Sequence, residues 1–572
     1  MCGIWSFISL IKQNVNYFKL FKDFMNLKHR GPDHTVFNIF GKDNDTFVGF
    51  HRLAVIDNDL KSNQPFIVNN ENGETIIFMC NGEIYNYAYL QTKYKLSDKH
   101  GDCYTLLELY INLPLSEFLE LFNYEIQGEF AFVLYVFNQN GKLNKLILGR
   151  DQVGVRPLYI NNNQNNHIYV ASEIKSMLAF NDIIEEFPPG TIKMYNFLMI
   201  NEISLPTITN FTFKNIYLTK PKMCDEEEFL LNLRKSVINS VEKRICYNQP
   251  VAFLVSGGVD SSLVAGIASK IYGEDKPLNT FCCGLKYTHN DVPQEGTDLY
   301  YARKVAKHIG SNHTEVLFTP EEGIELIEEV IRTIESWDVT TIRASIPQYI
   351  VLRHIAQNTD AKVVYVGEGT DEVLSSYMFN WYAPDGEALH QAALEYVDKI
   401  HYYDVKRVDR CVSRWSLEAR VALLDPEFII NSWQIPADYR LPVYQNMEKW
   451  WIRKAFELHN IIPKEVLWRT KTAFSDGVSS IKKSWFEILQ DYVETKVCDD
   501  EFNKAIYIYP ENTPKTKEAY FYRRTFCKFF GEHNQTCIPN YWQPKWGNDK
   551  KLINEYIDPS ARVLDITKIL EK

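Results

Sequence analysis

The sequence lacks the features that would place the chain in a membrane or export it from the cell. Its longest wholly apolar run, from Phe130 to Phe137, is far shorter than the roughly 20 residues that cross a bilayer. The N-terminus has neither a basic stretch nor a small-residue cleavage site, so we expect no signal peptide. We find neither an internal repeat nor a low-complexity tract. The sequence therefore predicts no membrane partner.

Paired cysteines and an excess of positive charge are missing as well. The 11 cysteines contain no C-x-x-C pair, and the neighbours Cys282 and Cys283 lie on a predicted strand, where they would face opposite ways. This usage is typical of reduced thiols, so we expect a cytoplasmic protein. The net charge of −11, from 73 acidic and 62 basic side chains, argues against a nucleic-acid-binding surface but not against a local anion pocket.

The sequence does contain a phosphate-binding pattern, VAFLVSGGVDSS, at residues 251–262. An apolar run predicts a buried strand, two glycines allow a tight turn, and N-cap residues then begin a helix. This layout aims backbone N–H groups and a helix dipole at an anion. No GK[ST] follows, which excludes the P-loop of kinases and GTPases. SGG alone would be explained by a tight turn, whereas the whole stretch favours a nucleotide site.

At SGGVDSS the chain resembles the N-type ATP pyrophosphatases, which adenylate a carboxylate or carbonyl oxygen and release pyrophosphate. Further strand-then-helix units at 279–284 and 362–366 predict a doubly wound α/β parallel sheet. The resemblance implies ATP as substrate, with Mg²⁺ held by Asp260 and Asp371, and links Glu368 to formation of the acyl-adenylate. The ATP-binding residues that it implies are Val255, Ser256, Gly257, Gly258, Asp260, Ser261, Cys283, Val366 and Gly367.

Roughly the first 200 residues contain apolar or alternating runs between turn residues, which predicts two stacked sheets covered by helices. Four short sequences stand out: MCGIW at the start, HRGPD at 29–33, RLAVID at 52–57 and NGEIYN at 81–86. Each alone has a structural explanation, since GPD and NG are turn formers. In this order they resemble the class II glutamine amidotransferase domain, an α+β N-terminal-nucleophile fold (an αββα sandwich). The match continues through GRD at 149–151, VRPLY at 155–159 and ASE at 171–173. In the same region the sequence predicts strands at 47–53, 75–80, 130–137, 145–149 and 167–171, and helices at 17–27 and 104–110.

The chemistry of such a domain accounts for a cysteine in second position. Removal of Met1 would leave Cys2 with a free α-amino group, whose pKa of about 8 lies near that of a thiol at about 8.5, so the amine can act as base. The resemblance implies that the Asn81 side chain and the Gly82 N–H stabilise the oxyanion. It further implies that Arg52 holds the carboxylate of glutamine, and Asp102 with Glu83 its ammonium. The chain departs from the resemblance just before Asp102, where it has His100 and Gly101 and relatives usually carry Gly-Ser. The full predicted glutamine-binding set is Arg52, Leu53, Ala54, Val55, Ile56, Asn81, Gly82, Glu83 and Asp102.

The remaining motifs resemble glutamine-hydrolysing asparagine synthetases, and this resemblance covers essentially the whole chain. ESWDVTTIRAS at 335–345 resembles the segment that lines their aspartate site, and Lys449 would neutralise charge on the phosphates or the intermediate. The chain departs from the family where Val366 replaces Ser and where 374–377 is LSSY instead of FGGY. The predicted aspartate-binding residues are Glu335, Thr340, Thr341, Arg343 and Arg420.

We therefore expect an amidotransferase domain at residues 2–205, a connector at 206–224, a synthetase domain at 225–545 and a C-terminal tail at 546–572. The resemblance implies glutamine hydrolysis at Cys2 and passage of ammonia through a tunnel to β-aspartyl-AMP made from aspartate and ATP. The products would be asparagine, glutamate, AMP and pyrophosphate. A homodimer is compatible with the resemblance.

Three alternatives share parts of this architecture. A β-lactam-forming or peptide-cyclising relative usually lacks the cysteine nucleophile and changes the aspartate segment, whereas both are present here. A non-enzymatic amidotransferase-like binding protein would have an eroded adenylating loop, which is intact. A glutaminase that delivers ammonia to a sugar phosphate would need a different second half.

Overall fold

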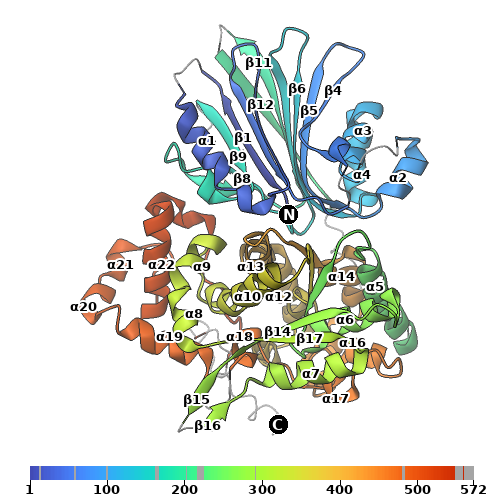
Figure 1. Cartoon of the computed structure of the whole chain (residues 1–572), viewed down its shortest axis with the longest axis vertical. Helices are drawn as coiled ribbons and strands as arrows, with labels where there is room; N and C mark the ends of the chain where they lie inside the picture. Colours follow the sequence, from blue (N-terminus) through green and yellow to red (C-terminus); the bar gives the residue numbers. More distant parts are fainter. Residues whose placement is uncertain are drawn as a thin grey trace. The chain divides into compact units, whose positions relative to one another are not determined.

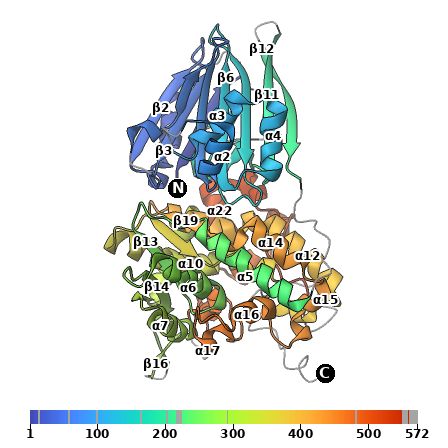
Figure 2. The same cartoon turned by 90° about the vertical axis from the view of Figure 1, so that its right-hand side faces the viewer.

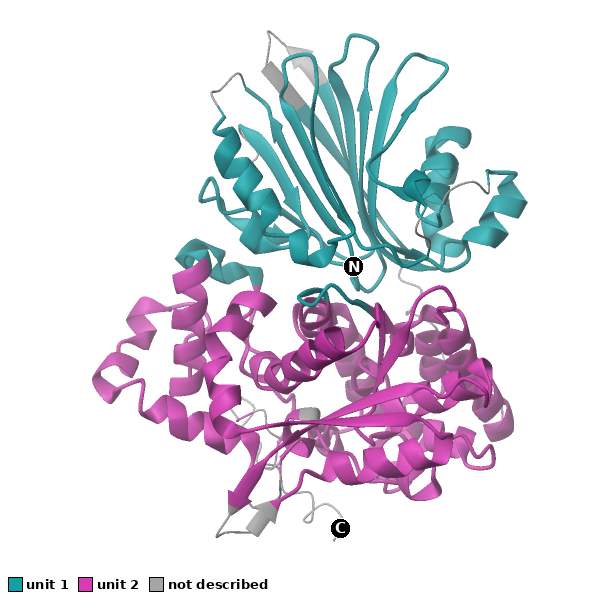
Figure 3. Cartoon of the chain, viewed as in Figure 1, with its two compact units in different colours: residues 1–215, 413–418, 530–537 teal, residues 216–412, 419–529, 538–572 magenta. Residues whose placement is uncertain are grey.

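The computed structural model describes residues 1–11, 15–56, 59–97, 101–161, 166–200, 203–214, 225–289, 292–479, 483–547 and 558, and Figure 1 follows the chain from blue to red. The chain divides into two compact units. Unit 1 consists of Met1–Asn215, Ser413–Glu418 and Phe530–Cys537, and unit 2 of Ile216–Val412, Ala419–Phe529 and Ile538–Lys572 (Figure 3). Asp57, most of the predicted connector and most of the predicted C-terminal tail lie outside the described residues. None of the helices that the structure describes combines the length and the hydropathy needed to cross a membrane.

Unit 1 contains two six-stranded antiparallel sheets. The first has the order β10 (Ile184–Glu186), β8 (Tyr159–Asn161), β9 (His167–Ala171), β1 (Gly3–Ser9), β3 (Thr46–Arg52) and β2 (His34–Phe40). The second has the order β12 (Ile203–Thr212), β11 (Thr191–Ile200), β7 (Leu143–Arg150), β6 (Gly128–Phe137), β5 (Thr75–Ile84) and β4 (Phe66–Asn69).

Helices cover the outer face of each sheet. In α1 (Tyr17–Met25), the Phe24 ring stacks on His51 of the first sheet, with ring centroids 4.1 Å apart. On the second sheet, α2 (Tyr87–Tyr94), α3 (Tyr104–Asn112) and α4 (Leu115–Tyr124) lie on one side (Figure 2) and share a hydrophobic core with its strands. The predicted αββα sandwich is therefore confirmed.

The apolar run that the sequence carries at 130–137 is explained by β6, whose two faces are both buried. Side chains alternate along a strand, so one set enters the core between the sheets and the other the core beneath the helices. The first set is Ala131, Val133, Tyr135 and Phe137, and the second is Phe130, Phe132, Leu134 and Val136.

The predicted strands and helices of this region correspond to β3, β5, β6, β7, β9, α1 and α3, and they are confirmed. The strand β12 was not predicted. It contains Pro206 and lies at the edge of its sheet, paired only with β11, which is where a strand tolerates proline. Because β12 continues to Thr212, unit 1 extends beyond the predicted boundary at residue 205.

Unit 2 is built around a five-stranded sheet in the order β17 (Asn312–Phe318), β14 (Asn279–Leu285), β13 (Val251–Leu254), β18 (Val363–Val366) and β19 (Glu418–Val421). Its first four strands are parallel. From β13 the chain runs outward through α6 (Val259–Tyr272) to β14 and through α7 (Thr297–Ile309) to β17, then returns to β18 through α8 (Pro320–Glu325), α9 (Ile327–Ile334) and α10 (Val339–Asn358). The strand order thus reverses between β13 and β18, and in such sheets the crevice for ligands lies at the carboxyl ends of the two strands that flank the reversal. The predicted doubly wound parallel sheet is confirmed.

Further helices of this unit are α5 (Glu226–Glu242), α11 (Thr370–Val373), α12 (Gly386–Lys399), α13 (Asp404–Ser413), α14 (Pro426–Gln434), α16 (Trp450–Phe456), α19 (Trp485–Glu494) and α22 (Lys517–Phe530).

Candidate active sites

Cys2 lies immediately before β1, and pairing between β1 and β3 fixes its surroundings. Gly3 is paired with His51, so Cys2 lies beside the end of β3, where the Leu53 N–H points at the Cys2 Sγ at 3.5 Å. The backbone N–H of Cys2 donates to Asn81 Oδ1 at 2.9 Å. Three of the four N-terminal motifs thus meet at Cys2, and the fourth, HRGPD, reaches it through Arg30.

A cavity of about 50 Å³ adjoins this thiol. Its walls include most of the predicted glutamine-binding residues, together with Ser62, Gln64, Phe66, Gly101, Cys103 and Glu418. Ala54 and Asn81 do not line it, and the Ala54 N–H instead donates to Asp33 Oδ2 at 2.8 Å. The predicted residues that do line the cavity are Arg52, Leu53, Val55, Ile56, Gly82, Glu83 and Asp102.

At Gly82 the backbone of β5 passes close to that of β6, and the neighbouring Asn81 has an amide N–H group without a partner among the described residues. A Cβ at residue 82 would lie 2.1 Å from the Glu129 carbonyl oxygen and 2.6 Å from Phe130 Cα on β6, so only glycine fits. Asn81 is fully buried, and its Nδ2 has no hydrogen-bond partner among the described residues. A buried amide donor without a partner, on a side chain that contacts the backbone of Cys2, is suited to stabilise a developing oxyanion.

Charges of opposite sign stand on the walls of the cavity. Arg52 is held by hydrogen bonds from its Nη1 to the Asp59 carbonyl at 2.9 Å and to Asn63 Oδ1 at 2.8 Å. Asp102 accepts a hydrogen bond from the Ile84 N–H at 2.7 Å. A pocket with one fixed guanidinium and one fixed carboxylate is complementary to the zwitterionic end of an amino acid.

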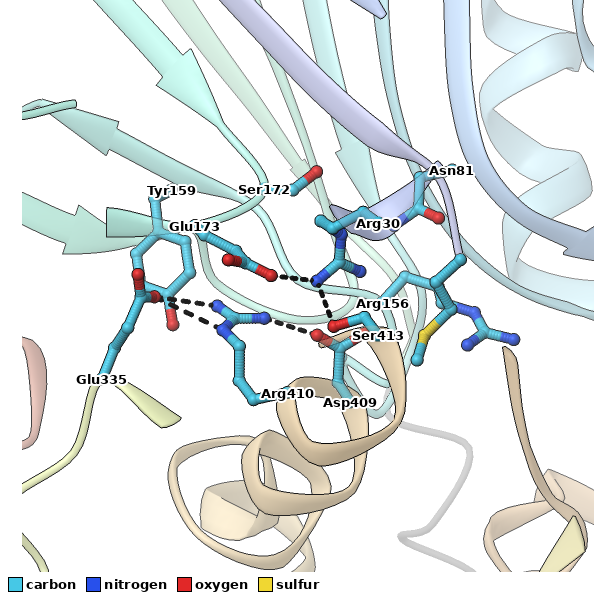
Figure 4. A network of polar contacts seen from close by, with 12 residues as sticks. Arg30, Asn81, Arg156, Tyr159, Ser172, Glu173, Glu335, Asp409, Arg410 and Ser413 are labelled. Atoms are coloured by element: carbon cyan, nitrogen blue, oxygen red, sulfur yellow. Dashed lines mark hydrogen bonds and ion pairs between the residues drawn. The ribbon is translucent and has the colours of Figure 1, made fainter. Parts of the chain in front are cut away.

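Two residues that hold Cys2 in place, Arg30 and Glu173, were not predicted as site residues. Figure 4 shows the contacts of Arg30 with Glu173 and Ser413. The Arg30 Nε donates to the Cys2 carbonyl at 2.8 Å, and its Nη1 donates to Glu173 Oε1 at 2.6 Å and to Ser413 Oγ at 3.1 Å. Arg30 and Glu173 are completely buried, and Glu173 also pairs with Lys175 at 2.7 Å. Arg30 belongs to the HRGPD motif and Glu173 to the ASE motif, so both were within sequences that stood out. That these two motifs contact each other becomes apparent only in the folded chain.

Met1 is fully buried, and its amino group donates to the Leu417 carbonyl at 3.1 Å. Burial lowers the pKa of this amino group to about 6, although Glu418 raises it. Burial also raises the pKa of the Cys2 thiol to about 11, against the lowering influence of the amino group. In a chain that keeps Met1, the thiol is therefore protonated at neutral pH.

In unit 2 the glycine turn lies between β13 and α6, at the carboxyl end of the strand. Gly257 has φ +71°, and a Cβ there would lie 2.4 Å from Tyr301 Cβ and 2.7 Å from the Ala302 nitrogen. Gly258 is the N-cap of α6. The loop after β18 approaches from the other side, since a Cβ on Gly367 would lie 2.6 Å from the Ser261 nitrogen. Glycine is required at both contacts.

A cavity of about 180 Å³ opens where these loops meet. Its lining includes most of the predicted nucleotide-binding and catalytic residues of this half. Gly257 and Val366 are not among them, because Gly257 packs on α7 and Val366 is buried in β18. The predicted residues that line the cavity are Val255, Ser256, Gly258, Asp260, Ser261, Cys283, Thr340, Gly367, Glu368, Asp371 and Lys449.

Two carboxylates and two ammonium groups are clustered in this cavity. Lys449 Nζ pairs with Asp260 Oδ2 and lies 2.6 Å from Asp371 Oδ1, while Lys471 pairs with Asp371 Oδ2. Burial would raise the pKa of Asp371, but the two lysines outweigh it and hold that pKa well below its usual range. The Asp260 Oδ1 is buried and has no partner among the described residues.

These carboxylates fit a magnesium ion that is shared with a nucleotide. Mg²⁺ is usually bound by one or two carboxylates plus phosphate oxygens and water, and Asp260 offers a free buried oxygen next to Asp371. No group of three or more His, Cys, Asp or Glu side chains that could hold a metal by themselves is found within the described ranges. The arrangement is therefore suited to a metal that arrives with phosphate.

Glu368 is oriented by residues that were not predicted. It accepts hydrogen bonds from Gln348 Nε2 at 2.9 Å and Arg407 Nη1 at 3.0 Å, and Arg407 also binds Asp404. Gln348, Asp404 and Arg407 lie on α10 and α13, far from SGGVDSS in the sequence, and no motif marked them. Further unpredicted residues of the cavity are Asp298, Glu372, Tyr377, Arg469 and Lys471.

Of the predicted aspartate-binding residues only Thr340 lines the cavity. The resemblance implies that the segment 335–345 lines the aspartate site. Most of this segment belongs to α10, and the face of that helix toward the cavity carries Thr340, Ala344, Gln348 and Val351. The structure does not bring the other four residues to it.

Each of those four has other surroundings. Glu335 accepts from Arg410 at 3.3 Å, and Arg410 also pairs with Asp409 (Figure 4). The Thr341 N–H and hydroxyl donate to Asp338, the N-cap of α10, at 2.8 Å. Arg343 binds Glu518 and Asp558, and Arg420 is buried in β19.

Comparison with known proteins agrees with the two units. Residues 1–223 match the family described as glutamine amidotransferase domain, and residues 232–387 and 382–554 match the family described as asparagine synthase. The glutamine-hydrolysing asparagine synthetases of Gallus gallus and Mus musculus are each 36% identical over 589 residues, 99% of this chain and 98% of theirs. That of Bos taurus is 36% identical over 601 residues and covers 100% of both chains. The chain belongs to the family of glutamine-hydrolysing asparagine synthetases.

Proposed function

We propose that the chain makes asparagine from aspartate, ATP and glutamine. Glutamine is hydrolysed at Cys2, and the ammonia is channelled to β-aspartyl-AMP, which yields L-asparagine, L-glutamate, AMP and pyrophosphate. The observation that carries this proposal is that one chain has two sites: Cys2, which contacts Asn81 and lines one cavity, and a glycine-lined cavity that contains Lys449 and Lys471. We also propose, from the family resemblance, a cytoplasmic location and a homodimer.

At the first site, the thiol of Cys2 attacks the side-chain amide of glutamine after Met1 has been removed. The freed α-amino group takes the thiol proton, and its present contact with Asn81 Oδ1 places it beside that side chain. The Asn81 Nδ2 and the Gly82 N–H donate to the oxyanion. Arg52 and Asp102 hold the carboxylate and the ammonium of the substrate, and Arg30 fixes the Cys2 carbonyl.

At the second site, the loop at 256–261 and the start of α6 bind the β- and γ-phosphates, which leaves the α-phosphorus open to attack. Lys449 and Lys471 are already in the cavity and can exchange their aspartate partners for phosphate oxygens. Glu368 is oriented by Gln348 and Arg407 beside the place where the acyl-adenylate forms. A magnesium ion held by Asp260 and Asp371 would neutralise charge on the pyrophosphate leaving group.

The proposed function is tested by incubating the protein with aspartate, ATP, Mg²⁺ and glutamine carrying ¹⁵N in its amide. Asparagine labelled in its side chain, formed together with equimolar AMP, is the expected result. Unlabelled asparagine would show that glutamine is not the donor. ADP in place of AMP would show that the attack is at the γ-phosphorus, and a β-lactam or cyclised product would favour the alternative relatives.

A chain that retains Met1, or carries an N-terminal tag, should lose glutaminase activity. Two effects combine: Cys2 then has an amide in place of a free amine, and burial keeps the pKa of its thiol at about 11. Mass spectrometry of the N-terminus, combined with glutamate release from glutamine, checks this expectation. The same preparation should still make asparagine from ammonia, and full glutaminase activity with a blocked amine would refute the proposed base.

A further inference from the structure

The loop that follows α11 carries two adjacent serines with different surroundings. Ser376 is completely buried, and its hydroxyl donates to Asp371 Oδ1 while its N–H donates to the Asp371 carbonyl at 3.0 Å. Ser375 is also buried, but its hydroxyl has no partner among the described residues, and its φ of +50° lies in the left-handed region that favours glycine. The Ser376 hydroxyl is thus an uncharged donor on Asp371, beside the two lysines.

We propose that Ser376 is a positioning residue, which holds the Asp371 carboxylate in the orientation that binds the metal–nucleotide complex. This inference rests on the proposed function. The three donors on Asp371 differ in what they can do when phosphate enters. Lys449 and Lys471 are cations that phosphate attracts away, whereas the Ser376 hydroxyl is neutral and fixed in the same short loop.

The geometry leaves room for both a donor and a metal on the same carboxylate. A carboxylate has about four lone-pair sites, so Asp371 Oδ1 can accept the Ser376 hydroxyl and still offer a lone pair elsewhere. A hydrogen bond from a second residue fixes the rotamer of a ligating carboxylate, and loss of such a contact typically weakens metal binding by about 10–100-fold. Ser376 does not itself line the cavity, so it acts only through Asp371.

The two serines provide matched variants for a binding experiment. The full-length protein is mixed with Mn²⁺ and an ATP analogue that has a methylene group between the α- and β-phosphorus. The concentration of free Mn²⁺ is then measured by electron paramagnetic resonance. We expect Ser376→Ala and Ser376→Gly to raise the Mn²⁺ dissociation constant by about 10-fold. Ser375→Gly should leave it unchanged and raise the thermal midpoint, because glycine relieves the left-handed backbone.

The outcomes are separable. The thermal midpoint of each variant reports whether it is folded, and Ser376→Gly keeps the test usable if Ser376→Ala does not fold. Wild-type Mn²⁺ affinity in Ser376→Gly, or an equal loss in Ser375→Gly, would overturn the positioning role. Failure of the wild-type protein to form AMP would overturn the proposed function instead, whereas a selective loss of Mn²⁺ binding in the Ser376 variants would still support the contact.

Discussion

Replacement of Cys2 by alanine should abolish asparagine synthesis from glutamine and leave synthesis from ammonia intact. We propose the thiol as the group that forms the covalent intermediate, and removal of a covalent nucleophile typically lowers the rate by about 10⁴–10⁶-fold. Ammonia needs no hydrolysis, so the synthetase site that we propose in unit 2 can use it directly. Asparagine formation is measured with glutamine and then with ammonium chloride, at saturating aspartate and ATP.

Alanine is a small change at this position, because the backbone contacts of Cys2 with Asn81 and Arg30 do not involve its sulfur. Cys498→Ala serves as the control, since Cys498 is exposed and lines neither cavity. Equal loss of both activities in Cys2→Ala would contradict the assignment of two chemically separate sites. Retained use of glutamine would exclude Cys2 as nucleophile.

Asp371→Asn should lower the formation of AMP and pyrophosphate by about 10²–10³-fold with either nitrogen source. The change removes a carboxylate that faces both Lys449 and Lys471 and that we propose as a metal ligand. Glutamine hydrolysis at Cys2 should persist. Pyrophosphate release and glutamate release, assayed in parallel, separate the two effects.

Loss of this carboxylate also removes an ion-pair partner, so a control must separate chemistry from stability. Asp425 offers one, because it is a buried carboxylate paired with Arg244 at 2.8 Å and Lys243 at 3.0 Å, outside the cavity. Breaking a buried pair costs about 3–5 kcal/mol, which urea denaturation would detect in Asp425→Asn. If Asp425→Asn lost AMP formation as severely as Asp371→Asn, the effect would be one of folding.

Most of the residues predicted for glutamine binding line the cavity beside Cys2, because the motifs that contain them flank paired strands. Cys2 precedes β1, Arg52 ends β3 and Gly82 lies within β5 near its end, and strand pairing brings such positions together. Arg30 and Glu173 were recognised only as parts of motifs. Their pairing beneath Cys2 depends on contacts across 143 residues of sequence, which no local pattern encodes.

In unit 2, most of the residues predicted at strand ends line one cavity, whereas Thr340 is the one residue predicted on α10 that does. Asp260, Gly367 and Asp371 follow parallel strands, so the topology of the sheet places them at one edge. To predict which residues of α10 line the cavity, one must know which face of the helix is turned toward it, and a continuous motif does not give this. Thr340 and Gln348 face the cavity, whereas Arg343 faces Glu518. Arg407 comes from a separate helix that carries no motif.

The composition of unit 1 has a consequence for the order in which the protein can mature on the ribosome. Its first 215 residues supply both sheets, but Ser413–Glu418 and Phe530–Cys537 belong to the same unit. Those late segments provide the acceptor oxygens for Arg30 at Ser413 and for the Ile184 N–H at Asn534, 2.9 Å away. Unit 1 therefore cannot form all of its hydrogen bonds until nearly the entire polypeptide has been translated.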